Sequence, residues 1–328
     1  MEQEFAFPDL GEFRFVSKIL SKSLRARTPV PGERGWLFAG DDAAEFDGWL
    51  VTKDLSAEGT HFVFDWSTPE EAVEKHIVSN VSDISAMGGV PRLALVGICT
   101  SKRWSPEVCE RVATAFAEGF KKRGITLLGG DTVSAEVGLF STTLLGTHSG
   151  RVLRRNAAKP GDGVFVVGTL GKSAAGLWIL MNKPELRAKF PRLVAHHVAP
   201  AIDDLAGVKL VKAGVSGACI DISDGLSSEL AHLALSSKVG VKVLQEALPI
   251  DEDVLELCAL QHIDPYELAL NGGEEYQLVF TSKLSESILG ALDFGPITKV
   301  GEVFEGGGVY IESAGKLRPL SAGGWSHS

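Results

Sequence analysis

Residues 68–89, TPEEAVEKHIVSNVSDISAMGG, contain a helix whose start and end are both marked in the sequence. Thr68 is suited to cap a helix, Pro69 to occupy its first position, and Glu71 to complete a capping box. We therefore predict a helix that opens after Thr68, runs towards Met87 and ends at the Gly-Gly pair that follows.

This predicted helix carries an aspartate in its interior. Asn80 and Asp83 are three residues apart, so they share one face of the helix. Aspartate has a poor propensity for the middle of a helix, and we expect Asp83 to have a polar partner. A solvated helix face is the alternative interpretation.

Aspartates beside Gly, Ser or Thr recur along the chain, at the expected ends of strands and helices. Each alone is usually a helix cap or a turn residue. Five such segments instead indicate carboxylates gathered around metal ions, because Mg2+ prefers oxygen ligands and shares them with substrate phosphates. The pattern predicts a Mg-nucleotide enzyme. The segments are Gly40–Ala44, Thr52–Asp54, Asn80–Asp83, Gly129–Thr132 and Asp221–Gly225.

The composition is that of a soluble globular protein with room for two domains. The chain has 328 residues, of which 45% are hydrophobic and 23% charged. A net charge of -10 argues against nucleic-acid binding, and no apolar run approaches membrane-spanning length. The four cysteines form no close pair, and residues 1–5 lack a signal-peptide pattern. We therefore expect reduced, buried thiols and a cytoplasmic location.

Helix-like and strand-like segments alternate along the chain, which predicts an α/β or α+β fold. A break in composition at residues 151–162 marks the expected boundary between an N-terminal domain, residues 1–150, and a C-terminal domain, residues 151–328. Strands are expected at 49–52, 93–100, 125–128, 139–147, 163–167, 219–222, 276–281 and 309–312, and further helices at 106–123, 173–181 and 226–236.

A Gly-Lys-Ser sequence within residues 168–173 invites comparison with a P-loop. That pattern needs a glycine at position 166, which is Val166. We therefore expect an ordinary turn between a strand and a helix.

Two other segments are candidates for binding a nucleotide and its metal. Gly130 and Asp131 follow the strand expected at 125–128, where small residues permit a phosphate to approach and Asp131 to hold a metal; an ordinary turn is the alternative. Asp221 and Ser223 face one way if their segment is extended, and Ser223 or Asp224 is placed to cap the next helix.

Three further residues are candidates for contacting a substrate. Glu274 and Glu275 precede a strand, where neighbouring side chains point to opposite faces, so we expect Glu274 alone to face a site. Trp325 lies in a Gly-Gly tail, where it either packs on the protein or stacks on a ligand. His61 is either structural or a phosphate contact.

Taken in order, these segments resemble those of the thiamine-monophosphate kinases, a family of the PurM-like ATP-binding superfamily. The resemblance covers nearly the whole chain, and the ordered set is more specific than any single motif. It runs through Gly40–Ala43, His61–Phe62, Asn80–Gly89, Gly129–Thr132, Arg155 with Lys159–Asp162, Gly168–Leu177, Asp221–Leu226 and Gly272–Tyr276.

The resemblance implies roles for individual residues. The implied magnesium ligands are Asp42, Thr52, Asp54, Asp83, Asp131, Asp221 and Asp224. The implied ATP contacts are Gly130, Asp131, Arg155 and Ser223, and the implied contacts to thiamine monophosphate are His61, Glu274 and Trp325. Asp131, Arg155 and Asp221 are the residues we expect to carry catalysis.

The resemblance also implies a reaction and an assembly. The γ-phosphoryl group of ATP would pass directly to the phosphate of thiamine monophosphate, giving thiamine diphosphate and ADP. The acceptor phosphate has a second pKa of about 6, so no general base is required. Catalysis would rest on alignment and on charge neutralisation by several Mg2+ ions and Arg155. The implied fold is PurM-like, with N-terminal strands of two protomers forming a barrel across a homodimer.

Two positions depart from the family pattern. Lys53 stands where the family commonly has Ser or Thr, and an ammonium group cannot ligate Mg2+. Either one metal ion is missing or Lys53 neutralises phosphate. Residues 275–277, Glu-Tyr-Gln, replace the usual Asp-Tyr-Glu, while Glu274 is retained.

Other functions remain as alternatives. One is a related PurM-like enzyme, such as an aminoimidazole ribonucleotide synthetase. The chain has neither the C-terminal cysteine of the hydrogenase-maturation dehydratase nor the early cysteine of selenophosphate synthetase, since its first cysteine is Cys99. A non-catalytic sensor of nucleotide or thiamine phosphate is the other alternative, and retention of six candidate acids argues against it.

Overall fold

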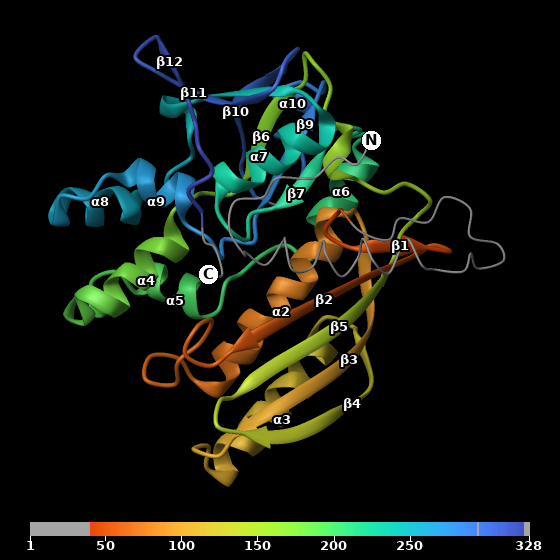
Figure 1. Cartoon of the computed structure of the whole chain (residues 1–328), viewed down its shortest axis with the longest axis vertical. Helices are drawn as coiled ribbons and strands as arrows, with labels where there is room; N and C mark the ends of the chain where they lie inside the picture. Colours follow the sequence, from red (N-terminus) through yellow and green to blue (C-terminus); the bar gives the residue numbers. More distant parts are fainter. Residues whose placement is uncertain (1–39, 294, 325–328) are drawn as a thin grey trace, which may run out of the picture.

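The computed structural model describes residues 40–293 and 295–324 and contains two β-sheets with helices packed on them (Figure 1). The first sheet has the order β1-β2-β5-β3-β4, in which only β3 and β4 pair in parallel. Its strands are β1 (Ala44–Phe46), β2 (Trp49–Ala57), β3 (Val90–Ser101), β4 (Thr126–Ala135) and β5 (Leu139–Thr147). Its two helices are α2 (Pro69–Ala86) and α3 (Pro106–Lys122).

The predicted capping box at the start of α2 is confirmed. The Thr68 side chain accepts from the Glu71 amide, and the Glu71 carboxylate accepts from the Thr68 amide at 2.7 Å. The helix ends at Ala86, with Met87 as its C-cap. Its apolar residues form a core with α3 and with one face of the first sheet, where the fully buried Phe140 and Leu144 of β5 point. The other face of that sheet is exposed at Leu55, among others.

The second sheet has the order β12-β11-β8-β10-β6-β9-β7, with β8 and β11 parallel and the other pairs antiparallel. Its strands are β6 (Gly163–Val167), β7 (Cys219–Asp221), β8 (Gly240–Leu244), β9 (Leu278–Ser282), β10 (Ile297–Phe304), β11 (Gly308–Ser313) and β12 (Lys316–Pro319). The accompanying helices are α4 (Lys172–Asn182), α5 (Pro191–Val198), α6 (Ala206–Lys212), α7 (Leu226–Ser237), α8 (Glu252–Gln261), α9 (Pro265–Asn271) and α10 (Glu286–Leu289), with short 3-10 turns at Arg155–Ala157, Pro184–Ala188 and Gln245–Ala247.

Strands β6, β9 and β7 of the second sheet are buried on both faces, whereas the edge strand β12 is exposed. Valines of β6 and β8 pack with α7 on one side, while Phe165 and Phe280 pack with α6 and α10 on the other. Helices α4, α5 and α8 share a smaller apolar cluster of their own. The sheets lie on either side of the boundary expected near residue 150, and the assignment of two domains on that basis stays a prediction.

Helix α2 connects the two halves. Its last residues meet α6 closely, because a Cβ on Gly207 would lie 1.7 Å from the Ser85 carbonyl oxygen. The Gly207 amide donates to Ser85 Oγ at 3.3 Å. In Figure 1, α2 runs from the first sheet up to α6 and β7. One helix therefore carries side chains from the first half into the junction with the second.

Two local predictions are wrong. Gly129–Thr132 does not follow a strand but lies inside β4, which extends to Ala135. Neither Ser223 nor Asp224 caps α7, whose N-cap is Gly225 with no side-chain hydrogen bond.

The four cysteines are free, as expected, but only two of them are buried. Cys219 and Cys258 are buried, whereas Cys99 and Cys109 are half-buried. Among the described residues, no helix is long and apolar enough to cross a bilayer.

Candidate active site

Three aspartates from distant parts of the chain meet where α2 reaches the second sheet. Asp42 precedes β1, Asp83 lies in the last turns of α2, and Asp221 ends β7. One carboxylate oxygen of each lies within 4.8 Å of the other two. The sequence placed these residues among its metal-ligand candidates, and the fold brings them together.

Hydroxyl groups and one arginine hold the three carboxylates. Ser82 Oγ donates to Asp221 Oδ2 at 2.6 Å, and Thr52 Oγ1 donates to Asp83 Oδ2. The Arg155 guanidinium donates to Asp42 Oδ1, while its backbone amide donates to Asp41 Oδ1 at 3.0 Å. The second oxygen of Asp42 is buried without a hydrogen-bond partner.

Crowding of buried acids raises their proton affinity. Burial and the charge of Asp42 raise the pKa of Asp221 to about 8, and burial with the charges of Asp54 and Asp221 raises that of Asp83 well above its usual value. Burial and Asp42 also raise the pKa of Asp41 to about 6. A divalent cation would remove the repulsion between these carboxylates and would give the unpartnered Oδ2 of Asp42 a ligand bond. The all-oxygen donor set therefore fits Mg2+.

The alternation of β2 explains which side Lys53 occupies. Thr52 is buried towards α2, and Lys53, the next residue, is exposed on the opposite face. Its ammonium donates to Ser141 Oγ at 2.6 Å, on neighbouring β5. Asp54 is on the Thr52 side, where its charge raises the pKa of Asp83. Lys53 thus leaves the three-aspartate cluster intact.

Gly130 and Asp131 lie apart from this cluster within the single chain. They are exposed on β4, the outermost strand, with β5 and β3 between it and β2. Asp131 pairs with Gly97 in β3, which pairs with Ser141 in β5, so all three belong to the same open face as Lys53. The predicted grouping of Asp131 with the other acids is not present within one described chain.

A buried glutamate that the sequence analysis missed organises the segment after Asp221. Glu229 of α7 accepts from the Asp224 amide at 3.0 Å and is 3.4 Å from Ser223 Oγ. Burial, followed by the charge of Asp221, raises the pKa of Glu229 well above its usual value. A glutamate five residues after Asp224, within an otherwise apolar helix, is the sequence feature that could have identified Glu229 as a site residue. Ser223 and Asp224 adjoin the cluster through Asp221.

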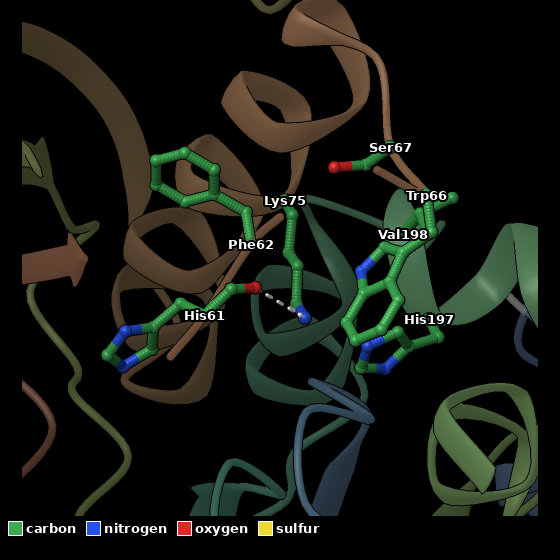
Figure 2. Close-up of a pocket in the computed structure, with 7 residues that line it drawn as sticks. All are labelled: His61, Phe62, Trp66, Ser67, Lys75, His197 and Val198. Atoms are coloured by element: carbon green, nitrogen blue, oxygen red, sulfur yellow. Dashed lines mark hydrogen bonds between the residues drawn. The ribbon is translucent and has the colours of Figure 1, made fainter. Parts of the chain in front are cut away.

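The substrate-contact candidates lie at the other end of α2. Glu274 Oε2 accepts from Lys75 Nζ at 2.6 Å, and Lys75 Nζ also donates to the His61 carbonyl oxygen at 3.1 Å. A small pocket beside them is lined by His61, Phe62, Trp66, Ser67, Lys75, His197 and Val198 (Figure 2). Glu275 instead is buried and faces His196 at 3.0 Å. Strand alternation does not set these directions, because β9 begins only at Leu278 and Glu274 has a φ of 60°. Trp325 lies outside the described residues.

The fold and the cluster define the class of protein. The family model "AIR synthase related protein, N-terminal domain" matches residues 40–148, which hold the first sheet and Asp42, Asp54, Asp83 and Asp131. Residues 40–148 are thus similar to the N-terminal domain of AIR synthase related proteins.

Relatives that match most of the chain define the family. A thiamine-monophosphate kinase of Pyrococcus horikoshii is 36% identical over 292 residues, 88% of this chain and 90% of that protein. One of Aquifex aeolicus is 33% identical over 326 residues, 97% of this chain and 98% of that protein. A solved structure described as "AaThiL complexed with AMPPCP and TMP" superposes with a TM-score of 0.82 at 33% identity, covering 99% of this chain and 100% of that one. The chain belongs to the thiamine-monophosphate kinase family.

Proposed function

We propose that this chain is a thiamine-monophosphate kinase. The bond between the γ-phosphorus of ATP and its bridging oxygen breaks, a terminal phosphate oxygen of thiamine monophosphate bonds to that phosphorus, and thiamine diphosphate and ADP leave. The observation that carries the proposal is the cluster of Asp42, Asp83 and Asp221, two of them buried and Asp83 half-buried, in a chain of this family. A related structure bound to AMPPCP and TMP supports the same pair of ligands.

Mg2+ is the proposed metal, held by Asp42, Asp83 and Asp221, with Asp54 and Thr52 beside them. When bound, it supplies positive charge to the phosphates of the two substrates. Asp224 is proposed as a further ligand from the adjoining turn. The fit rests on the buried unpartnered oxygen of Asp42 and on an oxygen-only donor set.

Arg155 is the proposed phosphate contact from the chain itself. Burial lowers the pKa of its guanidinium, but the neighbouring carboxylates, Asp42 first and then Glu229 and Asp221, together raise that pKa overall. Arg155 Nε is buried without a hydrogen-bond partner, so the side chain retains a donor for a ligand oxygen. Ser223 is proposed to contact ATP beside it. The acceptor phosphate is largely ionised near neutral pH, so these residues need only align and neutralise.

The open face of the first sheet is the proposed dimer interface. Leu55, Leu95 and Val133 are 54%, 43% and 58% exposed there, which is unusual for a row of apolar residues on a sheet. A homodimeric barrel formed from the N-terminal strands would cover them. Such a barrel would also carry Gly130 and Asp131 towards a bound nucleotide. Gly130 is therefore proposed to contact ATP, and Asp131 to contact ATP and hold its metal.

The free thiols are consistent with the proposed cytoplasmic location. The alternatives are a related PurM-like synthetase and a non-catalytic sensor. All three are separated by supplying Mg-ATP with thiamine monophosphate, with thiamine as the control substrate. Formation of thiamine diphosphate supports the kinase. Binding of both ligands without any diphosphate after long incubation would favour the sensor, and absence of thiamine monophosphate binding would favour another synthetase.

A further inference from the structure

Lys75 is a nearly buried cation at the junction of the two halves. Its side chain is 6% exposed, and it projects from α2. Its ammonium donates to the His61 carbonyl oxygen at 3.1 Å and to Glu274 Oε2 at 2.6 Å. A buried ammonium is costly unless it is paired and hydrogen-bonded. Here one charge links the turn after β2 with a segment 199 residues further along the chain.

Glu274 is constrained on its other sides as well. Its backbone has a φ of 60°, in the left-handed region that non-glycine residues rarely adopt, and its amide donates to the Ser223 carbonyl oxygen at 2.7 Å. His197 Nδ1 lies 3.6 Å from Glu274 Oε2 and 3.1 Å from Ser173 Oγ. Backbone strain of this kind persists only when the surroundings hold it in place. The Glu274 carboxylate is therefore fixed between Lys75 and His197.

The pocket beside Lys75 is built from both halves of the chain. In Figure 2 the Lys75 ammonium lies between His61 on one side and Trp66 with His197 on the other. Trp66 and His61 come from the segment between β2 and α2, and His197 from α5. Beside this pocket Lys75 joins the two halves, because its ammonium contacts the His61 carbonyl oxygen in one half and Glu274 in the other.

Helix α2 also fixes how far this pocket lies from the acidic cluster. Lys75 and Asp83 are eight residues apart, so they are separated by about 12 Å along the helix. Thiamine monophosphate is an elongated molecule with its phosphate at one end and its aminopyrimidine ring at the other. One helix thus sets the distance between the acidic cluster and the pocket beside Lys75.

We propose that Lys75 is a positioning residue that holds Glu274 and the His61 turn in register for the ring end of the substrate. It sets the affinity for thiamine monophosphate and takes no part at the reacting phosphates. This inference rests on the proposed function for the identity of the substrate, and its test is chosen so that the two can fail separately.

The test compares Lys75→Met, Glu274→Gln and the double variant, with Lys102→Met as control. Lys102 forms a surface ion pair with Glu136 and so matches Lys75 in charge but not in burial. Lys75→Met is expected to raise the KM and the Kd for thiamine monophosphate at least about tenfold. The KM for ATP should change less than about twofold and kcat less than about threefold. The double variant is expected to bind thiamine monophosphate no more weakly than the weaker-binding single variant, because both substitutions break the same Lys75–Glu274 contact.

Lys75→Met leaves the Glu274 carboxylate poorly neutralised, so its folding is checked by circular dichroism. If it does not fold, the double variant, which removes both charges, replaces it in the comparison. An unchanged Kd for thiamine monophosphate in the folded variant overturns the proposal, as does an equal loss of affinity for ATP. Calorimetric binding of thiamine monophosphate gives this answer even if the wild-type chain shows no turnover, in which case only the kinase assignment fails. If the wild-type chain does not bind thiamine monophosphate, both fail.

Discussion

Replacing Asp221 by Asn separates two effects of the crowded carboxylates: the loss of folding stability that their repulsion causes and the turnover that their metal binding supports. Asp221 is buried in a cluster with Asp42 and Asp83, and burial with the charge of Asp42 raises its pKa from 3.8 to about 8. An acid with a raised folded pKa stabilises the fold below pH 4 and loses that contribution as pH rises towards 8. Asn has nearly the same shape and can still accept from Ser82. The variant should therefore be more stable than the wild type when no metal is present.

The size of the gain follows from the pKa difference. At pH 7 the gap from the unfolded value of 3.8 is roughly three units, which sets a ceiling of about 4 kcal/mol. Shared protonation with Asp83 and local relaxation reduce this, so we expect about 1–2 kcal/mol, or roughly 1–3 °C in melting temperature for a chain of this length.

The assay is thermal unfolding in chelator at pH 5 and pH 8, then with excess Mg2+, using exposed Asp65→Asn as control. Asp221→Asn should exceed the wild type at pH 8, by less at pH 5, and should gain less from Mg2+. Its turnover should fall at least about tenfold, since one proposed ligand is lost. A variant that melts at or below the wild type at pH 8 without metal, and responds equally to Mg2+, would refute the reasoning.

Three further outcomes are expected. His76 is buried between Ser56 and Thr142, and burial, then the charge of His61, lowers its pKa to about 3. The neutral side chain therefore stabilises the fold above pH 6.5, and this contribution is lost as pH falls towards 3, by about 2 kcal/mol at pH 5. In urea titrations, the free energy of unfolding of His76→Gln should fall less steeply between pH 6.5 and pH 3 than that of the wild type. An equally steep fall would contradict this. Asp131→Asn should lose turnover at least about tenfold while its melting temperature stays within about 2 °C, and undiminished turnover would remove Asp131 from the site. Val133→Glu should elute with a light-scattering mass near 34.9 kDa, half the wild-type value, and equal masses would exclude the open face of the first sheet as the dimer interface.

Local signals were sufficient for helices α2, α3, α4 and α7, but they missed α5, α6, α8, α9 and α10 and were inadequate for the edge strand β4. The capping box of α2 involves residues three apart, so the sequence specifies it directly. Gly129 and Gly130 suggested the end of a strand, yet β4 continues through them. A Cβ on Gly130 would lie 1.8 Å from the Val96 carbonyl oxygen, so close pairing with β3, and not a turn, requires that glycine. This requirement depends on a strand pairing that no local pattern encodes.

The candidate site also has one part that the sequence predicts and another that only the folded chain shows. Residue types and their order identified Asp42, Asp83 and Asp221, but only the topology shows that these three meet and that Asp131 lies on the opposite face of the sheet. Lys75 was missed because a lone lysine in a helix is usually solvated. Its partner lies 199 residues away, so burial and pairing became visible only in the folded chain.

The central claim is phosphoryl transfer to thiamine monophosphate, and a product assay tests it most directly. The chain is incubated with Mg-ATP and thiamine monophosphate, or with thiamine, and nucleotides and thiamine phosphates are separated by ion exchange. We predict thiamine diphosphate and ADP in equal amounts from thiamine monophosphate, and no phosphorylated product from thiamine. Binding of ATP and thiamine monophosphate with no thiamine diphosphate after long incubation would contradict the account.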